Sequence, residues 1–255
     1  MKRLAPLIVI IGSCLAAAPA FAQTIGVVLL HGKTGSPATV IDGLAAALRG
    51  AGYLVDAPEM CWSHRRIYDR SFTDCLTEID AAVARLRGQG AAKVVVAGMS
   101  QGGDAALVYG ATRSGLAGII ALAPAASPEH QSTLPEIAHS IDEARAMVAA
   151  GRGNETAGFA DRNSVNVLTV RTTAAVYLSY LDPRGPANML AGIQNLKAPL
   201  LWVAGTTDPS QQGAQSAFAQ VPPNPLNRFV TVASGHLGTP SAARDAVLAW
   251  LPTLR

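Results

Sequence analysis

The sequence of 255 residues predicts an α/β domain in which a mostly parallel sheet of about six strands lies between two layers of helices. Two observations support this fold class. Short apolar runs alternate along the chain with segments whose apolar residues recur at helical spacing, a pattern typical of parallel strands joined by helical crossovers. Hydrophobic residues make up 49% of the chain and charged residues 15%, so a buried core is expected and disorder is not.

The first 22 residues have the pattern of a secretory signal peptide. Lys2 and Arg3 precede an apolar run at 4–11, and a small-x-small motif ends at Ala22. We expect cleavage after Ala22, export to the periplasm or the exterior, and a mature chain without stable membrane insertion that forms one domain over 23–255. A second interpretation stays open, because the residues before Cys14 loosely fit a lipoprotein signal.

Six segments are predicted to be strands because each is a short run of apolar and β-branched residues. The clearest of them contains three consecutive valines. Continuous apolar runs indicate strands that are buried on both faces of a parallel sheet. In chain order the six segments are 24–30, 53–56, 93–97, 116–122, 199–204 and 228–233.

Helical patterns lie between and after these strands. In the first of them Ile41, Leu44 and Leu48 fall on one stripe, and two glycines follow its end. We therefore predict helices over residues 38–49, 73–86, 103–110 and 241–250.

One long segment, about residues 124–197, interrupts the alternation. It shows no evident strand; 137–150 and 170–181 carry helical patterns, and the stretch between them is polar and contains glycine. An insertion of this length is too long for a simple crossover. We expect a mostly helical cap over the carboxyl edge of the sheet.

Signal cleavage would leave two cysteines, Cys61 and Cys75. An even pair in an oxidising compartment predicts a disulfide, which would stabilise the fold by roughly 2–4 kcal/mol. Two separately buried thiols remain the alternative.

Charge and motif content exclude several classes of protein. The formal net charge is +3 and no basic run is longer than Arg65-Arg66, so nothing indicates a nucleic-acid binder. The five histidines are scattered and no H-E-x-x-H motif occurs, so we expect neither a metal nor an organic cofactor. Arg65 and Arg66 either contact an acidic group of a substrate or lie in a solvated loop.

The strongest chemical signal is residues 98–103, Gly-Met-Ser-Gln-Gly-Gly, directly after the valine-rich strand and directly before a helix. A nucleophile elbow requires this context, with glycine on both sides of a strained serine. Ser100 is therefore the candidate nucleophile. No phosphate-binding-loop or dinucleotide-binding pattern fits the same residues.

This hexapeptide resembles the elbow of the α/β-hydrolase superfamily, in particular its carboxylesterases, lysophospholipases and acyl-thioesterases. The resemblance covers residues 23–255 but is sharp only at short motifs. It implies an α/β-hydrolase fold. The family usually has eight strands, and this chain departs from that pattern because the first two are missing from the prediction, which makes it a minimal version with a cap insertion. It also implies a Ser-His-Asp acyl-enzyme mechanism with the chain order Ser, acid, His.

Two further residues complete this constellation. His236 follows the last predicted strand and is expected to act as the base for Ser100. Asp208 follows an apolar strand and a glycine turn, where an acid would orient the imidazole. Asp182, within the cap, is the substitute acid, and His130 and His139 are expected to be solvated.

Residues 31–35, His-Gly-Lys-Thr-Gly, follow the first strand and look like the superfamily's oxyanion loop. By that resemblance the backbone N–H groups of Lys33 and Gln101 hold the oxyanion. We expect His31 to brace the loop and the Lys33 side chain to be solvated.

These features predict an exported serine hydrolase that cleaves ester or thioester bonds of a small-molecule substrate. The sequence does not determine the oligomeric state, although a monomer is favoured. Two alternatives stay open. One is an aminopeptidase of the same fold, which needs an acidic pocket for a free amine. The other is a non-catalytic binding protein on a hydrolase scaffold.

Overall fold

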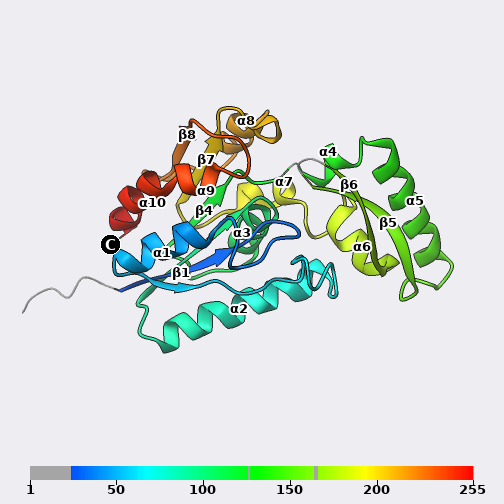
Figure 1. Cartoon of the computed structure of the whole chain (residues 1–255), viewed down its shortest axis with the longest axis horizontal. Coiled ribbons are helices and arrows are strands. Elements are labelled where there is room, and N and C mark those ends of the chain that lie inside the picture. The colour runs from blue at the N-terminus through cyan, green and yellow to red at the C-terminus, as the bar shows by residue number, and fades with distance from the viewer. Residues whose placement is uncertain (1–23, 126, 164–165, 255) are drawn as a thin grey trace, which may run out of the picture.

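The computed structural model describes residues 24–125, 127–163 and 166–254. The expected signal peptide, its cleavage point after Ala22 and the alternative lipoprotein residue Cys14 lie outside the described residues. Figure 1 shows one sheet with helices packed on both faces and a smaller unit at one end of the molecule.

The main sheet has six strands, all parallel, in the order β2-β1-β3-β4-β7-β8. Each coincides with a predicted strand to within a few residues at its ends, so the six-stranded parallel sheet is confirmed. The strands are β1 (Ile25–Leu30), β2 (Leu54–Asp56), β3 (Lys93–Met99), β4 (Gly118–Leu122), β7 (Leu200–Gly205) and β8 (Arg228–Val232).

The strand order reverses between β1 and β3. From β1 the chain moves outward to β2, then returns past β1 to β3 and continues to the other edge. Loops that follow the two strands at such a switch point diverge and leave a crevice at the carboxyl edge of the sheet. The switch point therefore places the loop after β1 beside the turn after β3.

Alternate residues of the central strands point to opposite faces of the sheet. In β1, Val27 and Leu29 join a core with α1 (Asp42–Gly50) and α10 (Arg244–Trp250). Val28 and Leu30 join the core on the other face with α2 (Phe72–Gly88) and α3 (Gln101–Thr112). Short helices complete these layers: α8 (Ala214–Phe218), α9 (Thr239–Ala242) and the 3-10 helices Ile193–Asn195, Pro209–Gln211 and Leu251–Leu254.

The cap between β4 and β7 differs from the prediction in one respect. Its middle is an antiparallel hairpin that the sequence did not predict, in place of a polar loop and the start of a helix. The cap elements are α4 (Pro128–Gln131), α5 (Pro135–Ala149), β5 (Thr156–Arg162), β6 (Val167–Thr173), α6 (Ala174–Leu181) and α7 (Met189–Gly192).

The hairpin forms because its inward residues alternate with outward polar ones. Phe159 and Asp161 of β5, with Val170 and Thr172 of β6, are buried. Phe159 stacks on Tyr177 of α6 with ring centroids 4.6 Å apart. Few of the hairpin's residues are large and apolar, so this period of two was weak in the sequence.

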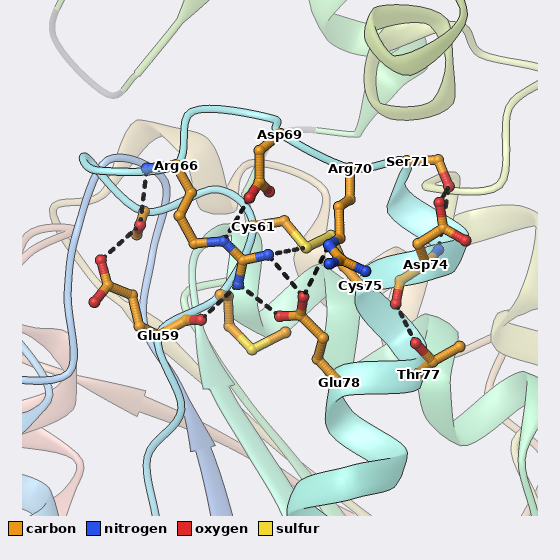
Figure 2. A network of polar contacts seen from close by, with 12 residues as sticks. Glu59, Cys61, Arg66, Asp69, Arg70, Ser71, Asp74, Cys75, Thr77 and Glu78 are labelled. Atoms are coloured by element: carbon orange, nitrogen blue, oxygen red, sulfur yellow. Dashed lines mark hydrogen bonds and ion pairs between the residues drawn. A yellow bond between two sulfur atoms is a disulfide. The ribbon is translucent and has the colours of Figure 1, made fainter.

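Residues 57–71, which follow β2, are braced against α2 (Figure 2). Cys61 and Cys75 form a disulfide with a Cα–Cα distance of 6.0 Å. The Arg66 guanidinium donates to both carboxylate oxygens of Glu78, at 2.7 and 2.8 Å, and to Asp69 at 2.9 Å. Arg66 therefore holds its own segment in place against α2. Arg65 is solvent-exposed.

Candidate active site

Ser100 lies in the sharp turn between β3 and α3. Its φ of 55° and ψ of −125° fall in a region that residues with a side chain rarely adopt. Its backbone N–H donates to the carbonyl of Leu122 at 3.0 Å, and its carbonyl accepts from the N–H groups of Gly103 and Asp104. Strain of this kind persists only where the surrounding structure fixes it, and these three bonds do so.

Glycines at two positions make this turn possible. A Cβ atom on Gly98 would lie 2.0 Å from the carbonyl oxygen of Gly102. A Cβ on Gly102 would lie 2.5 Å from the carbonyl oxygen of Leu30 and 2.6 Å from that of His31. All three distances are far below van der Waals contact, so the first turn of α3 packs directly against the end of β1.

His236 lies in the loop between β8 and α9. Its Nε2 atom is 2.9 Å from the Oγ atom of Ser100, although 136 positions separate the two residues in the chain. The side chain is 11% exposed. The structure thus brings the predicted base within hydrogen-bond distance of the predicted nucleophile.

Asp208 supports the other side of the imidazole. Its Oδ2 atom lies 2.7 Å from Nδ1 of His236, and its side chain is 1% exposed. With Nε2 facing Ser100 as acceptor, Nδ1 carries the proton and donates to Asp208, which fixes the tautomer. The structure brings all three predicted residues into one hydrogen-bonded chain.

Ser210 contacts both Asp208 and His236, and the sequence analysis did not predict it. Its backbone N–H and its hydroxyl both donate to Oδ1 of Asp208, at 3.0 and 2.7 Å, and its Oγ lies 3.2 Å from Nδ1 of His236. Bonds to the Oδ1 atom keep Oδ2 directed at the histidine. An available signal was the Asp-Pro-Ser sequence, because an aspartate commonly accepts from the amide two residues ahead.

The loop at residues 31–35 lies against the nucleophile. A Cβ on Gly32 would be 3.2 Å from the Cβ of Ser100. Within the described residues, the backbone N–H groups of Lys33 and Gln101 donate no hydrogen bond. The second of these lies at the N-terminus of α3, where the helix dipole favours negative charge. Two amides near the nucleophile are thus available to an oxyanion.

His31 braces this loop from within. The residue is buried, and its Nε2 atom accepts from the backbone N–H of Met60 at 3.0 Å while Nδ1 donates to the carbonyl of Gly32 at 2.8 Å. Burial lowers the pKa of His31 below its usual value, which agrees with a neutral ring that accepts at one nitrogen. The indole N–H of Trp62 donates to the His31 carbonyl at 2.8 Å.

The side chain of Lys33 is buried, so the expectation that it is solvated is wrong. Its Nζ atom lies 2.6 Å from Oδ1 of Asp161 in the cap hairpin, and the two side chains are 7% and 1% exposed. This partner could not be predicted, because Asp161 lies 128 positions away in a hairpin that has no clear signal in the sequence.

Asp104 lies in the first turn of α3, close behind the nucleophile. Burial raises the pKa of this carboxyl well above its usual value, with the backbone N–H of Ala125 opposing the shift. Burial thus favours the uncharged form of this acid, which lies close to the atoms where an oxyanion would form.

A cavity of about 270 Å³ opens onto Ser100 and His236. Its described lining contains no Asp or Glu, while Val40, Leu134 and Leu237 give it apolar walls. Further polar lining residues come from the loop after β1, the cap and the loop after β7: Lys33, Thr39, His130, Gln131, Arg162, Asn163 and Ser210.

The remaining candidates lie outside the hydrogen-bonded chain. Asp182 ends α6 in the cap and accepts from Arg145 at 2.9 Å on each carboxylate oxygen, so it is not the partner of His236. His130 and His139 are exposed, the former at the cavity.

Neither a metal-binding cluster nor a membrane-spanning helix is found among the residues that the structure describes. No group of three or more His, Cys, Asp or Glu side chains there is arranged to hold a metal ion. No helix in the same ranges has both the length and the apolar character needed to cross a bilayer.

Comparison with known proteins decides the family. Residues 27–250 match the model of the alpha/beta hydrolase family. The chain belongs to this family. This match confirms the resemblance first seen at the elbow, and it extends over nearly all of the described residues of this alpha/beta hydrolase. A search of curated proteins found no match.

Solved structures share the fold of this alpha/beta hydrolase at low sequence identity. Est1E from Butyrivibrio proteoclasticus, with bound ferulic acid, is 17% identical with a TM-score of 0.68, covering 92% of this chain and 91% of its own. A monoacylglycerol lipase from Paleococcus ferrophilus is 21% identical with a TM-score of 0.65, covering 90% and 95%. The hydrolase GrgF from a Penicillium species is 15% identical with a TM-score of 0.67, covering 92% and 90%.

Proposed function

We propose that this protein is an exported serine hydrolase that cleaves carboxylic ester or thioester bonds through Ser100, His236 and Asp208. The observation that carries the proposal is the unbroken chain from Ser100 Oγ through His236 to Asp208, at 2.9 and 2.7 Å, on the wall of a cavity. A serine hydroxyl becomes an effective nucleophile only when an adjacent base takes its proton.

In the first half-reaction, His236 Nε2 takes the hydroxyl proton as Ser100 Oγ attacks the substrate carbonyl carbon. The carbonyl oxygen becomes an oxyanion, which the backbone N–H groups of Lys33 and Gln101 would bind; one such donor is worth about 3–4 kcal/mol in the transition state. The imidazolium, held by Asp208, then gives its proton to the leaving alkoxide or thiolate. An acyl group remains on Ser100.

In the second half-reaction, water replaces the leaving group. His236 Nε2 takes a proton from the water as its oxygen attacks the acyl carbon, and then returns that proton to Ser100 Oγ. A carboxylic acid is released and the serine is restored. Asp208 stays ionised throughout and stabilises the imidazolium in both halves.

Ester hydrolysis fits the cavity better than aminopeptidase activity. A free amine needs a carboxylate partner, and the described lining has apolar walls and no Asp or Glu. Solved structures with the same fold include Est1E with ferulic acid bound, a monoacylglycerol lipase and a thioesterase domain. As part of the proposal, we infer that this chain also accepts acyl groups from an ester oxygen or a thioester sulfur.

Export is a separate part of the proposal. It rests on the pattern of the first 22 residues and agrees with the disulfide between Cys61 and Cys75, because disulfides persist in oxidising compartments. Fractionation of cells that express the full chain, with N-terminal sequencing of the product, tests it. Recovery of uncleaved protein from the cytoplasm would contradict export.

A fluorophosphonate probe tests the nucleophile directly. We expect stoichiometric labelling of the wild-type protein at Ser100, shown by peptide mass spectrometry, and no labelling of Ser100→Ala.

A panel of p-nitrophenyl esters of increasing acyl length, run beside aminoacyl-nitroanilides, then separates the enzyme classes. Faster turnover of the nitroanilides would favour the peptidase, and a folded protein inert in both assays would favour a non-catalytic binding protein.

A further inference from the structure

The Lys33 side chain joins the candidate oxyanion loop to the cap hairpin. Its Nζ atom lies 2.6 Å from Asp161 Oδ1 and donates to the carbonyl of Arg162 at 3.0 Å. Both side chains of the ion pair are almost completely buried. Burying two charges costs about as much as their attraction returns, so stability alone does not explain why this pair lies next to the nucleophile.

Asp161 is the meeting point of three segments. Besides Lys33, its carboxylate accepts from the hydroxyl of Tyr68 at 2.8 Å and from the backbone N–H of Arg162 at 2.7 Å. Tyr68 belongs to the disulfide-braced segment after β2, and its carbonyl accepts from Thr172 of β6 at 2.7 Å. Each oxygen of the carboxylate is thus bonded, and its position is fixed from several directions.

The same arrangement fixes the backbone of the loop. Thr34, the next residue, donates its N–H to the carbonyl of Trp62 at 2.8 Å. The Lys33 backbone therefore lies between an anchor on the braced segment and an anchor on the cap. Since a displacement of 1 Å at a catalytic group can cost about 10²-fold in rate, an amide that binds an oxyanion needs such anchors.

We propose that the Lys33–Asp161 ion pair is a positioning device, which holds the backbone N–H of Lys33 in the oxyanion hole and makes the cap hairpin part of the catalytic apparatus. The inference rests on the proposed hydrolase function. Neither charged group touches the substrate in this scheme; both act through the backbone amide of residue 33.

The substitution Lys33→Met distinguishes the contribution of the side chain to catalysis from that of the backbone N–H. It removes the tether but leaves the N–H of residue 33 in the chain. We expect kcat for a short p-nitrophenyl ester to fall about 100-fold, close to the effect of losing one oxyanion donor, while KM stays within threefold. Lys33→Arg keeps a charge and donors for Asp161, and we expect it to restore kcat to within about tenfold of wild type.

A second variant guards against loss of folding. Asp161→Asn alone would leave the lysine buried and unpaired, so the double variant Lys33→Met/Asp161→Asn removes both charges together. If the two side chains act as one unit, the kcat of the double variant should equal that of Lys33→Met. A further drop in kcat beyond that of Lys33→Met would show that the two side chains act independently. Circular dichroism and thermal unfolding establish the folded fraction of each variant.

Arg145→Met is the matched control, because it breaks another ion pair of the cap, with Asp182, that does not reach the oxyanion loop. We expect its kcat to stay within threefold of wild type. Hydrogen exchange adds a readout that does not depend on activity: the peptide over residues 31–35 should exchange at least about tenfold faster in Lys33→Met than in wild type or the control.

The outcomes separate this inference from the proposed function. A wild type that hydrolyses esters, with a folded Lys33→Met variant within threefold of its kcat or with unchanged exchange at residues 31–35, overturns the positioning role alone. A wild type that neither hydrolyses esters nor reacts with the fluorophosphonate overturns the proposed function, and the positioning role with it.

Discussion

Nδ1 of His236 lies 2.7 Å from Oδ2 of Asp208, and the two residues come from the loops that follow β8 and β7. These strands are neighbours in the sheet, so parallel pairing places both loops at the same edge. The carboxylate is 1% exposed, which strengthens its hold on the imidazole because little water competes for it.

Asp208→Asn tests whether this carboxylate orients the base. The amide keeps the size of the side chain but removes the charge and favours the wrong tautomer of His236, so we expect kcat to fall about 10³- to 10⁴-fold. Steady-state hydrolysis of a p-nitrophenyl ester measures it. Asp182→Asn, at the acid that pairs with Arg145, serves as control and should keep kcat within threefold; the reverse ranking would reassign the acid.

Gly98→Ala tests the steric requirement of the elbow. The added Cβ would lie 2.0 Å from a backbone oxygen, and we expect a loss of about 3 kcal/mol in the free energy of unfolding, the upper end for overpacking, together with loss of fluorophosphonate labelling. Urea unfolding followed by fluorescence measures the first.

Gly43→Ala is its control. Gly43 lies in α1, and a Cβ there meets nothing within 4 Å, so alanine should stabilise the protein by about 0.5–1 kcal/mol through its higher helix propensity. A Gly98→Ala protein as stable and as reactive as wild type would mean that the turn is not built as described.

The disulfide between Cys61 and Cys75 should stabilise the protein. Cys61 and Cys75 are 14 positions apart, and closing a loop of this size restricts the unfolded chain by about 3 kcal/mol. We expect the free energy of unfolding of the wild type to fall by about this amount on reduction. A Cys61→Ser/Cys75→Ser variant should match the reduced wild type and not respond to reductant; equal stability of the oxidised and reduced wild type would contradict the prediction.

Asp182 should make the cap sensitive to acid. Burial alone would raise the pKa of its carboxyl, but hydrogen bonds from Arg145 and from the amide and side chain of Arg184 outweigh burial and lower the pKa from 3.8 to about 2. The pKa of this carboxyl is near 4 in the unfolded chain and lower in the folded protein. Its ionised form therefore makes its full contribution to the free energy of unfolding above about pH 4. This contribution is lost as the pH falls toward 2.

The measurement is urea unfolding of wild type and Asp182→Asn between pH 7 and pH 2.5. We expect the wild type to be more stable by about 1–2 kcal/mol at pH 5–7, allowing for the partial exposure of Arg145, and the difference to shrink below pH 4. A difference that stays constant across this range would show that ionisation of Asp182 is not coupled to folding.

The parts of the fold that depend on local pattern could be predicted. The valine-rich run at β3 indicates its own structure, because continuous apolar residues are typical of a strand buried on both faces. The two glycines around Ser100 indicate a tight turn, because a Cβ atom at either position would collide with the backbone. The hairpin in the cap could not be predicted in the same way. Its alternation depends on Asp161 and Thr172 being buried, and the burial of polar residues is set by partners elsewhere in the chain.

The sequence by itself determined six parallel strands, a bent serine turn, and the order in which a base and an acid follow it, since each depends on neighbouring residues. Tertiary structure alone decided the strand order and the buried partner of Lys33. Those features depend on which loops meet at the carboxyl edge of the sheet. The meeting of Lys33 and Asp161 arises from packing across 128 positions of the chain, which no local pattern records.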